Sequence, residues 1–346
     1  NVSIVLNGTY YGPVEISDKK AVFNISNLNA GGYVFNATYG GDNNHNPAYI
    51  SGSFNVYKIN STLTADHADE ITYGNNLTIT LNNVEADLTG NITLYLDGVL
   101  VGTKVLKYDS DLSFTIVKPY EDLQHNITIN YTGDVNYFNK SITSTFKVLP
   151  AEPEMNISVS NITFCQDEIV EVNVSSDANG QISLYLDGGL VGTKDLSNGR
   201  AIFNLSGLIA KDDYFVKADF ISSGNYSDSS VNASFNVSKA VSNVTVYGRD
   251  IRNGQNETVT VVLAEPKTNG TVNITIKNSN GDIVDSLVIY EFTQTDILSG
   301  IDYIFENLDM GKYNITVEYY NDSNYFNSSS KYEFVEIGRA SCRERV

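Results

Sequence analysis

An eleven-residue stretch occurs twice in this chain with a single change, and this duplication limits the fold more than any other feature. Residues 94–104 read LYLDGVLVGTK, and residues 184–194 read LYLDGGLVGTK. A catalytic motif is needed only once, whereas a structural building block can be copied. The duplicated stretch is therefore expected to be a repeated structural unit.

Each copy is predicted to turn at an Asp-Gly pair, and two further stretches carry a related signal. Gly accepts a positive φ and Asp comes close to accepting one, so the pair favours a two-residue turn. Residues 1–12 carry an Asn-Gly pair in the same place, and residues 273–284 carry a longer loop. The predicted structural turns are Asn7-Gly8, Asp97-Gly98 and Asp187-Gly188.

Apolar residues alternate with more polar ones ahead of the turn, which is typical of a strand with one buried face. A two-residue turn is expected to place Val99 opposite Leu96 and Val101 opposite Leu94. These four residues would then share one apolar side, and the stretch is predicted to be a β-hairpin.

The copying extends over whole blocks of the chain. An alternating strand followed by a loop rich in Gly, Asp and Asn starts at Phe35, Ile127, Val216 and Ile315. The blocks close near Phe54, Phe146, Phe235 and Phe334, at successive spacings of 92, 89 and 99 residues. This period is too long for a solenoid repeat and suits an independent all-β domain with frequent turns. The predicted domains are 1–58, 59–148, 149–238 and 239–335.

Composition agrees with an all-β class, since the chain has 23 Tyr, 6 Pro and no Trp, and helical periodicity is hard to find. A short insertion at 293–300 is the best non-strand candidate. Six or seven short strands per block predict an immunoglobulin-like β-sandwich, with another small sandwich topology as the alternative. The expected architecture is a series of tandem sandwiches in an elongated array.

The block pattern resembles the group-3 type of bacterial and archaeal immunoglobulin-like repeat domains. It consists of a strand leading into LDGxLVG, a later Y-x-G-D-x-N-Y loop and a closing F-x-V. The Asn-rich and Tyr-rich texture resembles the adhesin-like surface proteins of methanogenic archaea. The resemblance implies an extracellular location at the cell surface and a stalk or adhesin role, and it brings no catalytic residues. The third block departs from the pattern with ISSGNY where the others have Gly-Asp or Asn-Asp.

Both ends of the chain read as unnatural. Asn1 is expected to fall inside a strand, so the first domain is predicted to be truncated at its N-terminus. Residues 336–346, EIGRASCRERV, break the composition, and their codons can be written as a sequence that resembles a common sequencing adapter. We interpret this tail as read-through that is not native, and its presence in genomic DNA would contradict that interpretation.

An excess of acidic residues limits the expected partners. The chain has 41 Asp and Glu against 22 Lys and Arg, a net charge of −19 at pH 7. Such a surface repels nucleic acid and anionic membranes. Glycans or proteins of a cell surface are the remaining partners, and the fragment is expected to be a monomeric rod without membrane contact. Cys165 is expected just ahead of a strand, where no intradomain disulfide is predicted.

Asn-x-Ser/Thr sequons recur along the chain and have two interpretations. They are either glycosylation sites of an exported protein or ordinary polar residues on solvent-facing strand positions. Both interpretations place the Asn side chains on outward faces. The candidate glycosylation sites are Asn91, Asn126, Asn173, Asn204, Asn273 and Asn314.

Three histidines give no sign of catalysis or metal binding. His45 falls where the other blocks have Tyr137, Tyr226 and Tyr325, and His125 falls where they have Tyr33, Tyr214 and Tyr313. Both are interpreted as aromatic substitutes, and His67 as a solvated loop residue. No nucleophile motif or acid pair stands out. The chain is therefore predicted not to be an enzyme, with no catalytic residue.

One recurring constellation has a metal-binding interpretation. Oxygen-bearing side chains at alternate positions are part of a Ca²⁺ site, but such a site needs six to eight ligands. The alternative is that these side chains cap the turn by bonding backbone N–H groups. The weak calcium candidates are Asp42, Asn44, Asp134, Asn136, Asp322 and Asn324. The third block has Ser223 in place of the Asp, which favours the turn; no other cofactor is expected.

Short junctions between blocks favour a mechanical role. Residues 54–65 and 235–246 pass from one block to the next almost without a linker, and Pro150 and Pro153 stiffen the remaining junction. The leading function is a structural spacer in a cell-surface adhesin-like protein. One alternative is that the domains themselves bind a glycan or protein, with Tyr137, Tyr226 and Tyr325 stacking on sugars. The other is an accessory segment of a surface enzyme whose catalytic domain is missing.

Overall fold

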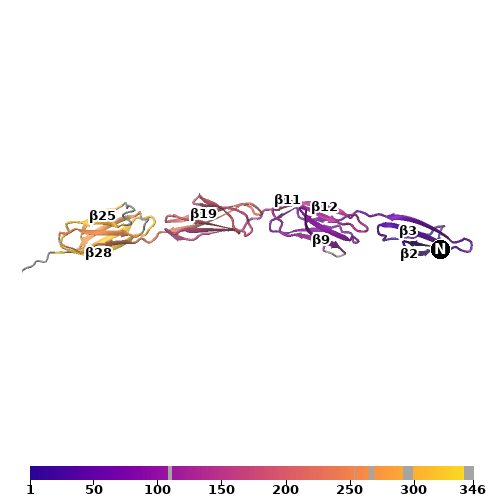
Figure 1. The fold of residues 1–346 in the computed structure, drawn as a ribbon, viewed down its shortest axis with the longest axis horizontal. Helices are drawn as coiled ribbons and strands as arrows, with labels where there is room; N and C mark the ends of the chain where they lie inside the picture. Colours follow the sequence, from indigo (N-terminus) through magenta and orange to yellow (C-terminus); the bar gives the residue numbers. More distant parts are fainter. Residues whose placement is uncertain (108–110, 253, 265–268, 291–298, 339–346) are drawn as a thin grey trace, which may run out of the picture. The chain divides into compact units, whose positions relative to one another are not determined.

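The fold is all-β (Figure 1). The computed structural model describes residues 1–107, 111–252, 254–264, 269–290 and 299–338. Most of the predicted insertion at 293–300 and the tail from 339 lie outside these residues. The chain forms two compact units, one of residues 1–151 with 224–226 and the other of 152–223 with 227–346.

The first unit begins with one four-stranded sheet, the first sheet set. Its order is β2-β1-β3-β4. The strands are β1 (Val2–Leu6), β2 (Thr9–Val14), β3 (Gly31–Tyr39) and β4 (Ala48–Val56). Apolar side chains of β1 and β3 line an open hollow, against which Phe23, Ile25 and Leu28 lie.

The second sheet set pairs a three-stranded with a five-stranded sheet. The orders are β10-β7-β5 and β6-β12-β11-β8-β9. Its strands are β5 (Thr64–Asp66), β6 (Glu70–Thr72), β7 (Leu77–Asn82), β8 (Gly90–Leu96), β9 (Val99–Leu106), β10 (Ser113–Ile116), β11 (Asp122–Tyr131) and β12 (Lys140–Leu149). The chain switches sheets between β5, antiparallel to β7, and β6, parallel to β12.

The second unit contains two more sets with the same connectivity. The third set has orders β13-β15-β18 and β14-β20-β19-β16-β17, and the fourth has β21-β23-β26 and β22-β28-β27-β24-β25. The third comprises β13 (Met155–Ser158), β14 (Ile162–Thr163), β15 (Glu168–Val174), β16 (Gly180–Leu186), β17 (Gly189–Asp195), β18 (Arg200–Leu205), β19 (Lys211–Ser222) and β20 (Ser229–Ser238). The fourth comprises β21 (Val244–Tyr247), β22 (Ile251–Arg252), β23 (Glu257–Leu263), β24 (Thr271–Asn278), β25 (Ile283–Ile289), β26 (Ile301–Phe305), β27 (Gly311–Tyr320) and β28 (Ser328–Ile337).

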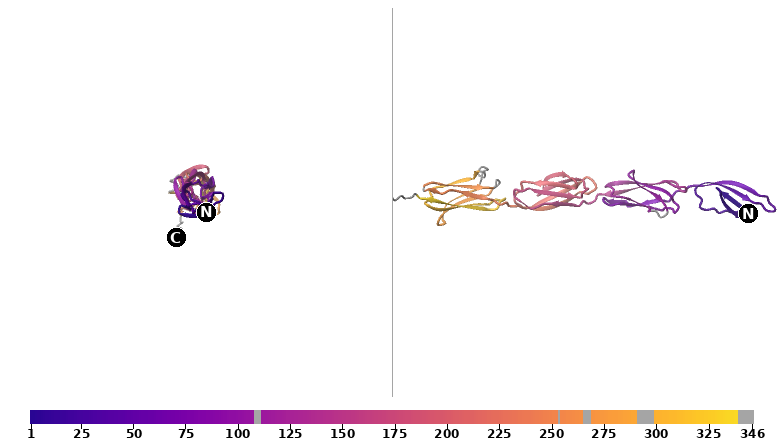
Figure 2. Two further views of the ribbon diagram at one scale, coloured as in Figure 1. Left: turned by 90° about the vertical axis from the view of Figure 1, so that its right-hand side faces the viewer. Right: turned by 60° about the horizontal axis from the view of Figure 1, so that its bottom comes forward.

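This connectivity is that of an immunoglobulin-like sandwich. In each complete set the first, third and sixth strands form one sheet, and the second, fourth, fifth, seventh and eighth form the other, the distribution of strands A-B-E and A′-G-F-C-C′. Figure 2 shows the ribbon from two further sides, coloured along the sequence. The predicted fold class is confirmed, and β28 ends two residues beyond the predicted domain boundary at 335.

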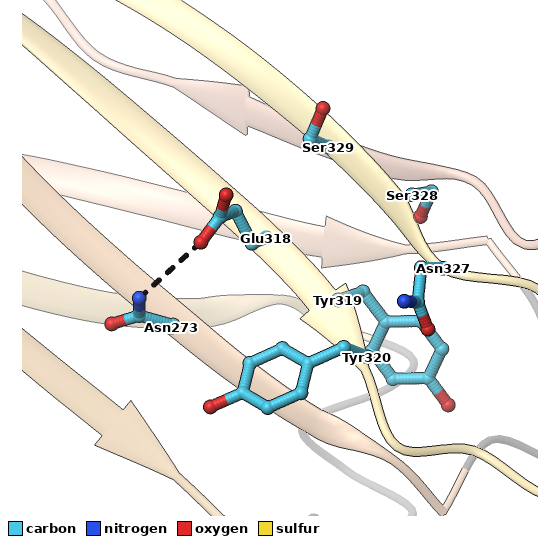
Figure 3. Close-up of a pocket in the computed structure, with 7 residues that line it drawn as sticks. All are labelled: Asn273, Glu318, Tyr319, Tyr320, Asn327, Ser328 and Ser329. Carbon is cyan, nitrogen blue, oxygen red and sulfur yellow. Dashed lines mark hydrogen bonds between the residues drawn. The ribbon is translucent and has the colours of Figure 1, made fainter.

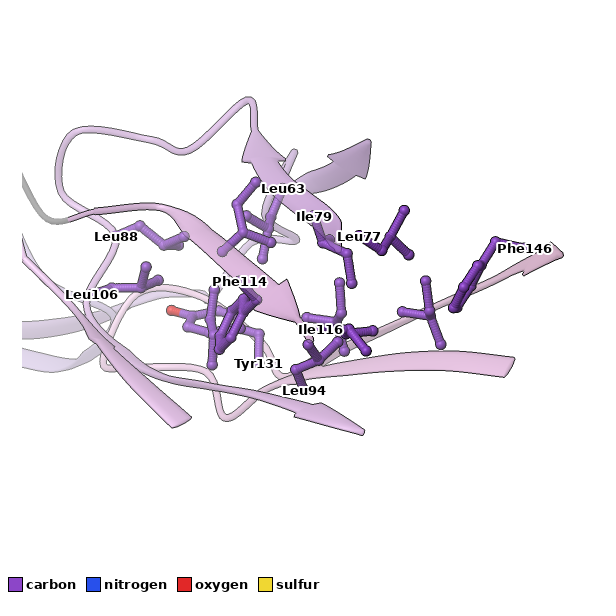
Figure 4. Packing of buried hydrophobic residues seen from close by; sticks show 14 of the residues in the cluster. Leu63, Leu77, Ile79, Leu88, Leu94, Leu106, Phe114, Ile116, Tyr131 and Phe146 are labelled. Atoms are coloured by element: carbon purple, nitrogen blue, oxygen red, sulfur yellow. The ribbon is translucent and has the colours of Figure 1, made fainter. Parts of the chain in front are cut away.

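The core of each complete set lies between its two sheets. In the second set Leu77 and Ile79 of β7 pack with Leu94 of β8 (Figure 4). Ile127 and Ile129 of β11 belong to the same cluster, and all five side chains are nearly inaccessible to solvent. The side chains of β11 alternate in and out with period two, which confirms the alternation predicted from Ile127 onward. Each complete set therefore buries its own apolar faces.

The duplicated stretch is the hairpin β8-β9, but one part of its predicted register is wrong. Leu96 pairs with Val99 as expected, whereas Leu94 pairs with Gly102 rather than Val101. A β-bulge opposite Leu94 and Tyr95 inserts Val101 as an extra residue. Val99 is 69% exposed, so β9 contributes less to the core than the apolar pattern predicted.

Candidate functional site

The turns of the duplicated stretch have positive φ at both central residues, as type I′ turns require. The φ angles are 42° and 89° at Asn7 and Gly8, 47° and 81° at Asp97 and Gly98, and 47° and 83° at Asp187 and Gly188. The first residue of each pair also accepts a hydrogen bond from a backbone N–H within a neighbouring strand. These bonds join Oδ1 of Asn7 to Val34 N (2.9 Å), Asp97 to Asn126 N (2.7 Å) and Asp187 to Phe215 N (3.0 Å).

This second role of the turn residue was missed at the sequence level. Asn and Asp tolerate positive φ and also carry a short side-chain oxygen acceptor, which Gly lacks, and all three turns use one of them. The use of Asn or Asp instead of a second Gly at the first turn position was the sequence signal that could have indicated this side-chain hydrogen bond. The turn is therefore tied to the sheet by its side chain as well as shaped by its backbone.

His125 occupies an aromatic position beside one of these turns. Its ring is fully buried and stacks on Phe146 with centroids 5.0 Å apart, and Nε2 lies 2.9 Å from the carbonyl oxygen of Tyr120. The same position in the other sets holds a Tyr whose hydroxyl donates to a carbonyl upstream, as in a tyrosine corner. These bonds are Tyr33 to Asn29 (2.9 Å), Tyr214 to Ile209 (3.2 Å) and Tyr313 to Asp309 (2.6 Å).

The other histidines are also engaged in local contacts. His45 lies on the surface with Nδ1 3.0 Å from the carboxylate of Asp42. His67, predicted to be a solvated loop residue, is half-buried, with Nε2 2.7 Å from the hydroxyl of Ser144. Its ring meets Phe146 edge-on with centroids 6.3 Å apart. The prediction for His67 is wrong because β12 packs against the loop that carries it.

The calcium candidates lie in the loop between the last two strands of a set. Oδ1 of Asp134 accepts from the N–H groups of Asn136 (2.7 Å) and Tyr137 (2.8 Å), and Oδ2 accepts from the N–H (2.8 Å) and hydroxyl (2.9 Å) of Thr89. Burial alone would raise the pKa of Asp134, but these donors hold it below its ordinary value. The carboxylate thus fixes the shape of its own loop.

Asp322 repeats this arrangement in the second unit. Its carboxylate accepts from the N–H groups of Asn324, Tyr325 and Asn269 and from the hydroxyl of Tyr319. A carboxylate offers about four lone-pair positions, so a cation would have to displace one of these donors. At Asp42 the hydroxyl of Tyr39, the Asn44 N–H and the His45 ring occupy the carboxylate.

The described residues hold no cluster of three or more His, Cys, Asp or Glu side chains arranged to bind a metal. Cys165 has a free thiol and a positive φ of 74° in the turn ahead of β15. Within the described ranges, no helix is long and apolar enough to cross a membrane.

A polar depression lies on the fourth set, between β24, β27 and the start of β28 (Figure 3). Tyr320 lies beside it, and Asn273 donates to Glu318 across it over 3.5 Å. The tyrosines proposed to stack on sugars are placed differently. Tyr137 and Tyr325 are only 6% and 3% exposed, so neither ring offers a free face to a ligand.

None of the six candidate glycosylation sites is buried. Asn91, Asn126 and Asn204 are exposed, and Asn173, Asn273 and Asn314 are half-buried. All six lie on strands with their side chains directed away from the core.

Among known proteins, only solved structures match this chain. No protein-family model matches the chain, and no curated protein matches it. A tetra-tandem repeat from the extending region of a large adhesion protein is 16% identical over 97% of this chain and 91% of its own length, with a TM-score of 0.38. Immunoglobulin domains 1–5 of Sidekick-1 are 14% identical over 98% of this chain and 74% of theirs, with a TM-score of 0.32. A Dscam isoform structure is 11% identical over 97% and 91%, with a TM-score of 0.25. These likenesses assign no function to the chain.

Proposed function

We propose that this chain is a spacer segment of a cell-surface, adhesin-like protein, in which non-catalytic immunoglobulin-like repeats hold another part of the protein away from the cell. The observation that carries the proposal is the repetition of one sandwich three times, each with its own closed core. Repeating one sandwich makes the protein longer and requires no catalytic or ligand-binding site in any copy. The proposal includes the extracellular location and the elongated, monomeric array expected from the sequence.

In the loops between the last two strands of a set, the polar side chains stabilise the fold through hydrogen bonds. The carboxylates of Asp134 and Asp322 each receive four hydrogen bonds from their own surroundings. His125, the one fully buried histidine of the described chain, contacts backbone, turn and core ring. The Asp and His side chains that could serve catalysis or metal binding therefore have structural roles in this fold. This supports the spacer proposal.

Ligand binding by the repeats is the second candidate, and the depression beside Tyr320 favours it. An amphipathic ring next to Asn and Glu side chains is a common way to hold a sugar. The depression is polar and open. The position of Tyr320 is held by Thr132, just after β11, in the second set and by Ile221 of β19 in the third, so of these three sets only the fourth has a Tyr there.

Array binding separates the two candidates. The full chain, fluorescently labelled, is applied to glycan and surface-protein arrays beside a Tyr320→Ala variant. The spacer proposal predicts no signal above background for either protein. A signal that the full chain gives and the Tyr320→Ala variant loses would overturn it in favour of binding.

A further inference from the structure

The Asp in the loop between the last two strands of a set (Asp42, Asp134 or Asp322) is called the corner Asp below. The side chain of the Asn two residues after it bonds to a neighbouring sheet set at Asn136 and Asn324. In the first unit, Oδ1 of Asn136 accepts a hydrogen bond of 2.9 Å from the backbone N–H of Ala30. Its Nδ2 lies 3.2 Å from the side-chain oxygen of Asn29. Ala30 immediately precedes β3 of the first set, whereas Asn136 lies between β11 and β12 of the second. One side chain thus joins two sets through a pair of residues that are 106 positions apart in sequence.

The second unit contains the same bond. Oδ1 of Asn324 accepts from the N–H of Ala210 over 2.9 Å. Ala210 immediately precedes β19, as Ala30 precedes β3. The neighbouring Tyr325 adds an apolar contact, because its ring meets Phe164 edge-on with centroids 5.3 Å apart. Its hydroxyl lies 3.7 Å from Sγ of Cys165.

A third example needs no corner Asp. Residues 224–226 belong to the first unit, where Oδ1 of Asn225 accepts from the N–H of Glu121, just ahead of β11, over 2.8 Å. The ring of Tyr226 meets Tyr73 edge-on at 5.5 Å. Ser223 stands here where the other loops have Asp. The Asn-Tyr pair therefore makes its contacts whether or not a carboxylate is present, which a calcium site would not explain.

The junction residue adds backbone bonds to the same loop. Ile59 donates its N–H to the carbonyl of Asn136 (2.9 Å) and accepts from the N–H of Phe138 (3.0 Å). Ala240 makes the same two bonds with Asn324 and Phe326, each 2.9 Å long. A preceding Lys donates to the carbonyl of the corner Asp, Lys58 to Asp134 and Lys239 to Asp322. The loop is thus held in place by its own Asp carboxylate and by the junction segment that leads into the set. These bonds do not involve the Asn side chain, which is left to bond to the neighbouring set.

We propose that the Asn-Tyr pair, Asn136-Tyr137 and Asn324-Tyr325, is a docking motif whose partner is another repeat of the same kind. The Asn side chain recognises the N–H that precedes the seventh strand of the preceding repeat, and the Tyr ring covers the turn ahead of that repeat's third strand where an aromatic is present. Within each unit the motif seats a repeat on its predecessor instead of leaving it on a free tether. This inference rests on the proposed spacer function for its meaning, although the contacts stand without it.

Backbone hydrogen exchange in the full chain tests the docking motif at its own bond. The amides of Ala30 and Ala210 are measured by NMR in the unaltered chain, in Asn136→Ala and in Asn324→Ala. Loss of a typical net hydrogen bond corresponds to about fivefold faster exchange. We expect this acceleration at Ala30 in Asn136→Ala and at Ala210 in Asn324→Ala, each without effect on the other amide.

Asn44→Ala is the matched control, because Asn44 occupies the same position in the first corner and only its backbone N–H takes part in a hydrogen bond among the described residues. It should leave both amides unchanged. Unchanged exchange at Ala30 and Ala210 in their own variants would overturn the proposal. If core amides such as Ile129 also accelerate, Asn136→Asp and Asn324→Asp decide, since Asp keeps an oxygen acceptor. If the amides of Ala30 and Ala210 stay protected from exchange in the Asp variants but not in the Ala variants, the docking proposal is supported. Equal loss of protection in the Asp and Ala variants overturns it. Neither result depends on ligand binding, so the array experiment fails or succeeds separately.

Discussion

The imidazole Nδ1 of His125 lies 2.7 Å from Oδ2 of Asp97, so a fully buried histidine is paired with the turn residue of the duplicated stretch. The other carboxylate oxygen of Asp97 accepts from the N–H of Asn126. One turn side chain therefore holds both the backbone of β11 at Asn126 and the ring of His125. In the other sets a Tyr fills the position of His125, so among the described residues only the turn of the second set is paired with an imidazole, which titrates near neutral pH.

The pairing predicts that the second set loses stability as the pH rises from the ordinary histidine pKa through the raised pKa of His125. Burial by itself lowers the pKa of His125, but its hydrogen bonds to Asp97 and to the Tyr120 carbonyl, with the charges of Asp97 and Asp122, leave that pKa raised. A raised folded pKa stabilises the fold fully below the unfolded value of about 6.5. That contribution is lost as the pH rises through the folded pKa. An NMR titration of the ring should give a pKa above the ordinary value.

Two variants separate the charge from the shape of the site. Asp97→Asn keeps a turn residue like Asn7 and should lower the pKa of His125. His125→Tyr restores the residue found in the other sets and should remove the pH dependence of hydrogen exchange in β11. A pKa at or below the ordinary value in the unaltered chain would contradict the pairing.

Substituting the turn glycine should destabilise only its own set. Gly98 has a φ of 81° and an added Cβ would meet nothing within 4 Å, so Gly98→Val acts through the backbone alone. A β-branched residue resists this φ, and we expect a loss of about 1–3 kcal/mol. Gly188→Val should act likewise in the third set. Hydrogen exchange of strands in each set reports local stability, and Gly102→Ala, without a positive φ, is the control. A loss below a few tenths of a kcal/mol would contradict the turn.

Removing the corner carboxylate should loosen its set with or without calcium. Asp134→Ala leaves the N–H groups of Thr89, Asn136 and Tyr137 without their acceptor, and we expect a loss of about 1–3 kcal/mol. Thermal unfolding with calcium and with chelator checks the alternative. Because a bound ion stabilises the folded state by mass action, a melting temperature that calcium raises in the unaltered chain and not in Asp134→Ala would restore the metal interpretation.

Glycosylation, if the chain is exported from its source, should follow exposure. Asn91, Asn126 and Asn204 project from strands into solvent, whereas Asn173, Asn273 and Asn314 are half-buried. We expect higher occupancy at the first three, because a glycan needs an open approach to the Asn side chain. Mass spectrometry of glycopeptides from the native protein measures this, and heavier occupancy at the half-buried sites would contradict it.

The fold was readable from the sequence because its determinants are local. Alternation at β11 gives the buried face, and the Asp-Gly pair gives the turn; both follow from the backbone rules of a few neighbouring residues. The bulge at Val101 was not readable, since it depends on how β9 meets β8 across the turn. The partners of Asn136 and Asp97 were not readable either. Ala30 and Asn126 become their partners only through pairing between distant segments, which a short motif does not encode.

Small-angle scattering from the chain tests the spacer proposal in solution. Short junctions, a net charge of −19 and closed cores leave the repeats no reason to collapse on one another. One repeat is expected to be about 30–40 Å long, from strands of eight to ten residues and their loops. The account predicts a maximum dimension several times that length, with little change between low and moderate salt. A compact, near-spherical particle would contradict the spacer proposal, and an extended particle that forms only with added calcium would contradict the roles given to Asp42, Asp134 and Asp322.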